Sequence, residues 1–174
     1  IKQNKIGVII MEVSRNIPPK DNFLQKVKNI AKKNNIVLIF DECSSGFRET
    51  YGGINIKYNV NPDIIIFGKA LGNGYAINAI VGKKSVMRNI DNTFISSTFW
   101  TERIGYAAGI ATLKEMKRLQ SWKIISKKGD YVKNQWKKIS ERHNIDIKIS
   151  GLRPMPSFKF MCEEHNILKT FITQ

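Results

Sequence analysis

Cysteine, histidine and acidic residues are scarce in this chain of 174 residues. It has two cysteines, two histidines and 14 acidic residues against 29 basic ones. Cys43 and Cys162 lie far apart, with no CxxC or cysteine–histidine spacing around them. The sequence therefore supports neither a metal site nor a disulfide framework, and two unpaired thiols fit a reducing, cytoplasmic setting.

Long apolar runs are missing as well. No stretch approaches the roughly 20 apolar residues that a helix needs to cross a bilayer, and the first residues do not have the pattern of a secretory signal. Hydrophobic residues make up 42% of the chain and charged residues 25%. This composition excludes a disordered chain and predicts a globular fold with a sizeable core.

The net charge of +15 has two interpretations. A basic chain could be a nucleic-acid-binding module. However, the excess consists of 22 lysines against 7 arginines, and arginine is the preferred residue for reading bases and phosphates. A compositional bias towards lysine is favoured, and nucleic-acid binding stays as the alternative.

The apolar pattern of the first two thirds predicts an α/β fold. Strands are expected at residues 6–11, 36–40, 63–67 and 77–81. The first of these is a continuous apolar run, which is typical of a strand buried on both faces. Asp21 can cap a helix that ends near Asn34, and a strand, a helix and a strand in this order form a parallel unit. The apolar face of that helix is expected to contain Phe23, Leu24, Val27, Ile30 and Ala31.

The last third has a different pattern. Helices are expected at 101–119 and 122–142, followed by strands at 146–149 and 158–161 that belong to a smaller unit. The inward face of the first helix is expected to contain Ile104, Ala107, Ala108, Ala111 and Met116.

Two ionisable residues follow the ends of predicted strands. Asp41 comes directly after residues 36–40, and Lys69 follows residues 63–67 with one glycine between. Ligands of open α/β sheets bind outside the carboxyl ends of the strands. A carboxylate and an amine could therefore face one small ligand from two sides. A buried ion pair, or two unrelated loop charges, explains the spacing equally well.

The glycines around Lys69 favour a binding site. Gly68, Gly72 and Gly74 relieve the steric limits on the local backbone. Their spacing matches neither a P-loop nor a dinucleotide-binding fingerprint.

Four stretches in chain order then resemble class III aminotransferases, which are pyridoxal-phosphate (PLP) enzymes. Residues 38–48 read LIFDECSSGFR, against a family pattern close to LIFDEVxxGFR. Residues 52–63 contain a double glycine and VNPD, residues 67–74 read FGKALGNG, and residues 97–99 read STF ahead of an alanine-rich helix. Within this family, the four motifs most resemble those of glutamate-1-semialdehyde aminomutase-like members.

The resemblance implies a fold and a domain organisation. Residues 1–120 would be the C-terminal half of the PLP-binding large domain of a fold-type I enzyme, with a mostly parallel sheet and flanking helices. Residues 121–145 would be a connecting helix, and residues 146–174 the start of a small α+β C-terminal domain. Because family members are considerably longer, both ends are interpreted as cut, and the chain alone is expected neither to bind PLP tightly nor to turn over.

The resemblance also implies roles for single residues. Lys69 would hold PLP through a Schiff base, and Asp41 would pair with the pyridine nitrogen. Cys43, where the family usually has valine, would pack on a face of the ring. Thr98 would reach the phosphate of the neighbouring subunit's PLP, which implies a homodimer. The implied reaction is amino-group transfer from an amino donor to an aldehyde or keto acceptor, with an intramolecular 2,1-aminomutase acting on a semialdehyde as the alternative.

The chain departs from the family near the expected site. Tyr75 to Ile77 stand where aminomutase-like members have Leu-Pro, and residues 100–103 read WTER where the family often has Ser-Gly-Asn-Pro. These changes leave the substrate open.

A few further residues carry weaker signals. Arg48 either binds a substrate carboxylate or makes a structural hydrogen bond within its loop. Phe99 and Trp100 are expected to wall a pocket or a subunit interface. His143 and His165 lie outside every motif, and we expect surface or structural roles for both.

Overall fold

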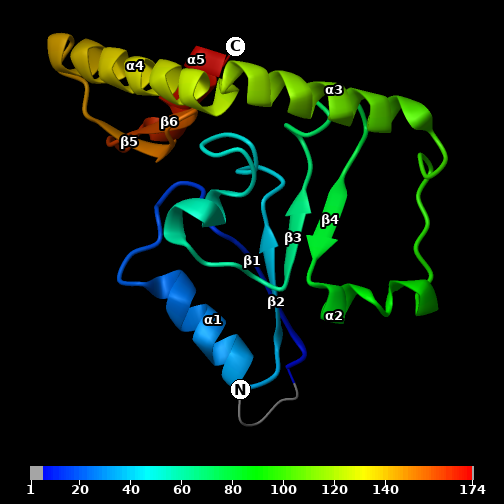
Figure 1. Ribbon diagram of the computed structural model, residues 1–174. Helices are drawn as coiled ribbons and strands as arrows, with labels where there is room; N and C mark the ends of the chain where they lie inside the picture. Colours follow the sequence, from blue (N-terminus) through cyan, green and yellow to red (C-terminus); the bar gives the residue numbers. More distant parts are fainter. Residues whose placement is uncertain (1–5, 174) are drawn as a thin grey trace.

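A mixed four-stranded sheet forms the centre of the computed structural model, which describes residues 6–173 except the side chain of His165 (Figure 1). The strand order is β1-β2-β3-β4. The strands are β1 (Val8–Glu12), β2 (Val37–Asp41), β3 (Ile64–Phe67) and β4 (Ala79–Gly82). The first three are parallel, and β4 is antiparallel to β3. The predicted α/β fold with a mostly parallel sheet is confirmed.

Helix α1 (Phe23–Lys33) connects β1 to β2. The predicted cap by Asp21 is wrong: Asn22 occupies the capping position and makes no side-chain cap hydrogen bond. Asp21 and Asn22 both have left-handed backbone angles, with φ of 52° and 55°, whereas a capping residue usually has an extended backbone. A tight turn closed by the Phe23 amide on the Lys20 carbonyl (2.9 Å) starts the helix instead.

The core lies between α1, one face of the sheet and the loop that follows β2. Leu38 and Phe40 alternate along β2 towards this core and are 1% and 0% exposed. Only Leu24 and Ala31 of α1 are buried beside them. The predicted apolar face of α1 was too wide, since Phe23 and Ile30 lie at its margins and are exposed.

The opposite face of the sheet is partly open. Val8 and Ile10 of β1 and Ile80 of β4 lie on this face by strand register and are more than half exposed. The predicted burial of β1 on both faces is therefore wrong for the described residues, because nothing in residues 6–173 covers this side of the strand.

Helices α3 (Arg103–Leu119) and α4 (Ser121–Arg142) lie almost end to end along one side of the molecule (Figure 1). Gln120 separates them with a left-handed φ of 50°. The buried residues of α3 are Gly105 and Gly109, not the predicted alanines and Ile104, which is 55% exposed. The helix passes close to the Ala76 carbonyl oxygen, and a Cβ at position 105 would lie 2.5 Å from it. Glycine therefore occupies the inward position.

The C-terminal part forms a hairpin against α4. Strands β5 (Ile147–Leu152) and β6 (Met155–Phe160) are antiparallel, and helix α5 (His165–Thr173), which the sequence pattern did not predict, follows them. Trp136 of α4 packs edge-on against Phe158 of β6, with ring centroids 4.9 Å apart.

Short helices occupy the remaining connections: η1 (Ile54–Tyr58), α2 (Lys84–Met87) and η2 (Ile90–Asn92). Among residues 6–173, no helix combines the length and the apolar character that a membrane crossing requires.

Candidate active site

Asp41 and Lys69 lie at the same edge of the sheet. Asp41 is the last residue of β2 and is in register with Ile66 of the parallel strand β3. Lys69 follows two residues after the end of β3, on an exposed turn where its own φ is 31°. Because parallel strands end at one edge, the structure brings the predicted amine and carboxylate to one place.

Cys43 lies close to Asp41 and to Gly68, the residue before Lys69. Its backbone amide donates a hydrogen bond to Asp41 Oδ1 at 2.9 Å. A Cβ added at Gly68 would lie 3.2 Å from Cys43 Sγ and 2.5 Å from Asn78 Oδ1, so a larger residue would have to displace the Asn78 side chain. Burial raises the pKa of the Cys43 thiol, the Asp41 carboxylate raises it further, and the Lys69 ammonium offsets part of this. The group is thus a thiol suited to packing rather than a nucleophile.

The two cysteines are expected to differ in reactivity. Cys43 is partly buried with a raised pKa, and Cys162 is exposed. Because only an accessible thiolate is alkylated, iodoacetamide at neutral pH should modify Cys162 about tenfold faster than Cys43. Mass spectrometry of the two cysteine peptides over time measures both rates in one sample. Equal rates would show that Cys43 is more accessible or more acidic than its surroundings indicate.

Ser44 contacts both cationic side chains of the site. Lys69 Nζ donates a hydrogen bond to Ser44 Oγ at 2.5 Å, and Arg48 Nε donates to the Ser44 carbonyl oxygen at 2.7 Å. The second bond is the structural hydrogen bond that was one interpretation of Arg48. Sequence reasoning missed Ser44, and the only available signal was its place three residues after Asp41.

Glu42 is a fully buried carboxylate directly behind the site. It accepts hydrogen bonds from the Ser45 hydroxyl and, at 3.0 Å, from the Asn55 amide. Burial raises its pKa, the hydrogen bonds from Ser45 and from the Ile54 and Asn55 amides lower it, and the charge of Asp41 raises it again, with a net rise. Glu42 therefore ties both ends of the loop that presents Ser44 and Arg48. It too was missed, because its burial depends on how that loop folds.

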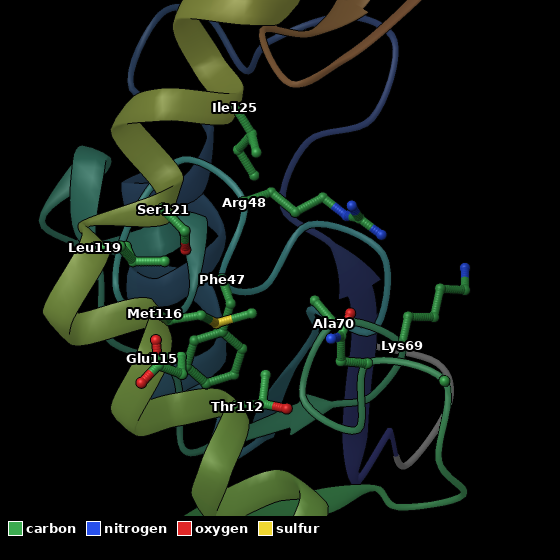
Figure 2. Close-up of a pocket in the computed structure, with 12 residues that line it drawn as sticks. Phe47, Arg48, Lys69, Ala70, Thr112, Glu115, Met116, Leu119, Ser121 and Ile125 are labelled. Atoms are coloured by element: carbon green, nitrogen blue, oxygen red, sulfur yellow. The ribbon is translucent and has the colours of Figure 1, made fainter.

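A cavity of about 460 Å³ lies between this loop, the turn at residues 69–74 and the junction of α3 and α4 (Figure 2). Arg48 and Lys69 line it, with Thr112, Met116 and Ser121 on the helical side. Asp41 and Cys43 are not among its lining residues. The Lys69 turn therefore forms part of the cavity wall, and the carboxylate and thiol stand outside it.

Lys69 also borders a second cavity of about 430 Å³. Phe99 and Trp100 wall it, as one of the two interpretations predicted, together with Tyr75 and Asn78. Thr98 is exposed and lines neither of the two cavities at Lys69. Its neighbours Ser97 and Phe99 line the second cavity.

His143 is an exposed residue at the end of α4, in agreement with a surface role. The side chain of His165 is outside the described part of the structure.

The groups at the edge of the sheet fit a cofactor with an aldehyde and a basic ring nitrogen. Lys69 presents an exposed primary amine that can condense with a carbonyl. Asp41 Oδ1 accepts the Cys43 amide at 2.9 Å, and the carboxylate also interacts with the Cys43 thiol. A carboxylate oxygen at this edge is available to hold a protonated ring nitrogen.

Sequence comparison places these features in a known family. The family described as "Aminotransferase class-III" matches residues 2–173. The chain is 35% identical over 157 residues to 3-aminobutyryl-CoA aminotransferase of Cloacimonas acidaminovorans, which covers 90% of this chain and 38% of that protein. It is 38% identical over 158 residues to glutamate-1-semialdehyde 2,1-aminomutase of Methanococcus maripaludis, which covers 86% of this chain and 37% of that protein.

Solved structures agree in fold. The FumI protein of Sphingopyxis sp. MTA144, in a PLP form, superposes with a TM-score of 0.85 at 21% identity, over 92% of this chain and 40% of that one. Ornithine aminotransferase from Plasmodium yoelii superposes with a TM-score of 0.82 at 26% identity, over 97% and 46%. The chain spans less than half the length of each of these relatives. It belongs to the class III aminotransferase family.

Proposed function

We propose that this chain carries the cofactor lysine of a PLP-dependent enzyme that transfers an amino group from an amino donor to an aldehyde or keto acceptor. The observation that carries the proposal is the position of Lys69, two residues after the end of β3, at the same edge of the sheet as Asp41 at the end of β2. When bound, PLP supplies an electron sink for the negative charge that develops on the substrate carbon.

Lys69, Asp41 and Cys43 have separate roles at the site. Lys69 would hold the cofactor covalently, and its amine, when free, would act on the proton of the substrate carbon, first as general base and then as general acid. Asp41 holds the proton on the ring nitrogen, which keeps the electron sink effective. Cys43, a thiol of raised pKa, packs on a face of the ring.

The remaining parts of the proposal concern assembly. Thr98, exposed on the segment before α3, contacts the phosphate bound by a neighbouring subunit in a homodimer. Residues 1–120 belong to the large, cofactor-binding domain, residues 121–145 to a connecting helix and residues 146–174 to the small domain. The two free cysteines support a cytoplasmic setting.

An intramolecular aminomutase is the second candidate. It is supported by the 38% identity to glutamate-1-semialdehyde 2,1-aminomutase. Both reactions use the same lysine and carboxylate, so the placement of Asp41 and Lys69 serves either. The family match over residues 2–173 favours both over a nucleic-acid-binding module.

Reductive trapping tests the lysine directly. With millimolar PLP and cyanoborohydride, Lys69 should be labelled about tenfold faster than exposed lysines such as Lys84, because neighbouring groups orient its amine and hold the cofactor. Peptide mass spectrometry gives the label at each lysine.

Two variants complete the design. Asp41→Asn should lower the labelling of Lys69, and Asp91→Asn, which removes an exposed carboxylate away from the site, should leave it unchanged. Millimolar PLP does not require the tight binding that this chain alone is expected to lack, so uniform labelling of all lysines in the unmodified chain would contradict the proposed role of Lys69.

A further inference from the structure

The second cavity at Lys69 has charged groups of opposite sign on its walls. Its volume of about 430 Å³ is typical of a small-molecule site. Among the described residues that line it, Lys69 is the only base and Glu102 is the only acid. A ligand that reacts with the Lys69 amine therefore shares its cavity with a carboxylate.

Aromatic side chains form much of the remaining wall. They are the half-exposed rings of Tyr75, Phe99, Trp100 and Tyr106. Aromatic walls beside a carboxylate suit a positively charged nitrogen, because the ring faces attract a cation and the carboxylate neutralises its charge. The same carboxylate would repel an anionic ligand.

The Glu102 carboxylate is not committed to another group of the described chain. Glu102 occupies the capping position of α3, but its side chain makes no cap hydrogen bond. It forms no ion pair within residues 6–173, and the adjacent Arg103 is not paired with it. A carboxylate at a helix N-terminus also stabilises the helix, but that effect requires neither aromatic neighbours nor a cavity shared with Lys69.

Backbone contacts place Glu102 relative to the opposite wall of the cavity. Its amide donates a hydrogen bond to the Phe99 carbonyl oxygen at 3.1 Å. One turn further along α3, a Cβ at Gly105 would lie 2.5 Å from the Ala76 carbonyl oxygen. The start of α3 therefore packs directly on the segment that follows the Lys69 turn, and this packing fixes the backbone that carries the carboxylate.

This cavity is also where the sequence departs from the family. Residues of both departing stretches, 75–77 and 100–103, line it. The aromatic rings of Tyr75 and Trp100 and the carboxylate of Glu102 belong to these stretches. We therefore expect this wall to determine which substrate the chain accepts.

We propose that the second cavity binds a positively charged nitrogen at the far end of the substrate, with Glu102 as its counter-ion and Trp100 as an aromatic wall. The other end of the substrate, which carries the amine or carbonyl, reacts at Lys69. The proposal rests on the proposed function and deepens it, since it names the substrate class: small molecules with an amine or carbonyl at one end and a cationic nitrogen at the other.

The experiment compares two aldehydes of the same shape, 4-(trimethylammonio)butanal and its uncharged carbon analogue 5,5-dimethylhexanal. In each case Lys69 Nζ adds to the aldehyde carbon with loss of one water, and hydride from cyanoborohydride reduces the resulting C=N bond. Peptide mass spectrometry gives the label at Lys69 and at the exposed Lys84. The ratio of the two labels removes differences in intrinsic reactivity between the aldehydes. We expect this ratio to be about fivefold higher for the cationic aldehyde.

Variants assign the preference to the cavity wall. Glu102→Gln should abolish it and leave the ratio for the uncharged aldehyde within about twofold, and Glu102→Asp should restore part of it. Trp100→Leu should lower the preference about twofold, because an aliphatic wall does not attract a cation. Glu163→Gln, which removes an exposed carboxylate that lines neither cavity at Lys69, should keep the full preference.

Competition tests the site without any substitution. Tetramethylammonium chloride, added to the unmodified chain, should slow labelling of Lys69 by the cationic aldehyde and not by the uncharged one. Sodium chloride at the same concentration controls for ionic strength and should have less effect.

Each outcome decides a different point. Equal ratios for the two aldehydes in the unmodified chain overturn the proposal. A preference that survives Glu102→Gln also overturns it, because another group then attracts the cation. If Lys69 is selective for PLP but shows no preference for the cationic aldehyde, the proposed function stands and the cation site fails. If Lys69 shows no selectivity for PLP but keeps the Glu102-dependent preference, the cation site stands and the proposed function fails.

Discussion

Replacing Gly129 by alanine should lower the free energy of unfolding by about 2 kcal/mol, although alanine is the better helix former. Gly129 lies in the middle of α4, where the helix crosses the turn between β5 and β6. An added Cβ would lie 1.7 Å from the Arg153 carbonyl oxygen and 3.0 Å from Pro154 Cα. Both neighbours are backbone atoms, so no side-chain rotation can relieve the overlap.

The turn is also held from two other sides. The Arg153 amide donates to Glu49 Oε1 at 2.8 Å, and the Arg153 guanidinium pairs with Asp130. A shift of the hairpin away from α4 would therefore break contacts as well as relieve the clash. The gain in helix propensity, about 1 kcal/mol, offsets only part of this cost.

Gly109 provides a matched control in α3. An alanine there would make ordinary contacts, the closest at 3.6 Å to Ile77. Gly109→Ala should keep or raise stability by up to about 1 kcal/mol. Urea unfolding followed by circular dichroism measures both variants. A Gly129→Ala chain as stable as the unmodified one would show that α4 and the hairpin are not in close contact.

Replacing Glu42 by alanine should lower the free energy of unfolding by about 3 kcal/mol. The side chain is 0% exposed and accepts hydrogen bonds from Ser45 and the Asn55 amide. Its removal leaves these buried donors without an acceptor and opens a void, and each unsatisfied group costs about 1–3 kcal/mol. Glu42→Gln keeps the volume and one acceptor oxygen, so it should be less destabilising than Glu42→Ala.

The pH dependence of the glutamine variant gives a second test. Burial raises the folded-state pKa of Glu42 above its ordinary value of 4.5. Between pH 4.5 and this raised pKa, the Glu42 carboxyl group is protonated to a greater extent in the folded state than in the unfolded state. The stability of the unmodified chain therefore falls as the pH rises from 4.5 through the raised pKa. Glutamine cannot titrate, so Glu42→Gln should gain stability relative to the unmodified chain across this window.

Urea midpoints measured at intervals above pH 4.5 provide the curve. Glu141→Gln, an exposed residue whose contact with Lys137 is 3.9 Å long, serves as the control and should run parallel to the unmodified chain. Asp63 has a lowered pKa: its partial burial is outweighed by hydrogen bonds from the Leu38 amide and Lys83. Its contribution is lost only as the pH falls below 3.8, outside this window. Parallel curves for Glu42→Gln and the unmodified chain would show that folding does not raise the pKa of Glu42.

The sequence by itself determined the strands of the sheet and the position of Asp41 and Lys69 at its edge. The apolar runs before Asp41 and Lys69 are short and bounded by polar residues and glycine, which predicts strands that end at these positions. Because parallel strands end at one edge, both residues had to lie at that edge. Short apolar runs, which are a local property of the sequence, were sufficient for this part.

Only the tertiary structure decided which residues serve Asp41 and Lys69. Ser44 reaches the amine 25 positions away, and Glu42 is anchored by Asn55 because the intervening loop folds back. The inward face of α3 likewise depends on how closely Gly105 approaches Ala76, not on where apolar side chains lie along the helix. Contacts of this kind depend on the path of the chain between distant residues. A local pattern carries no information on that path, and so the support of the site emerged only in three dimensions.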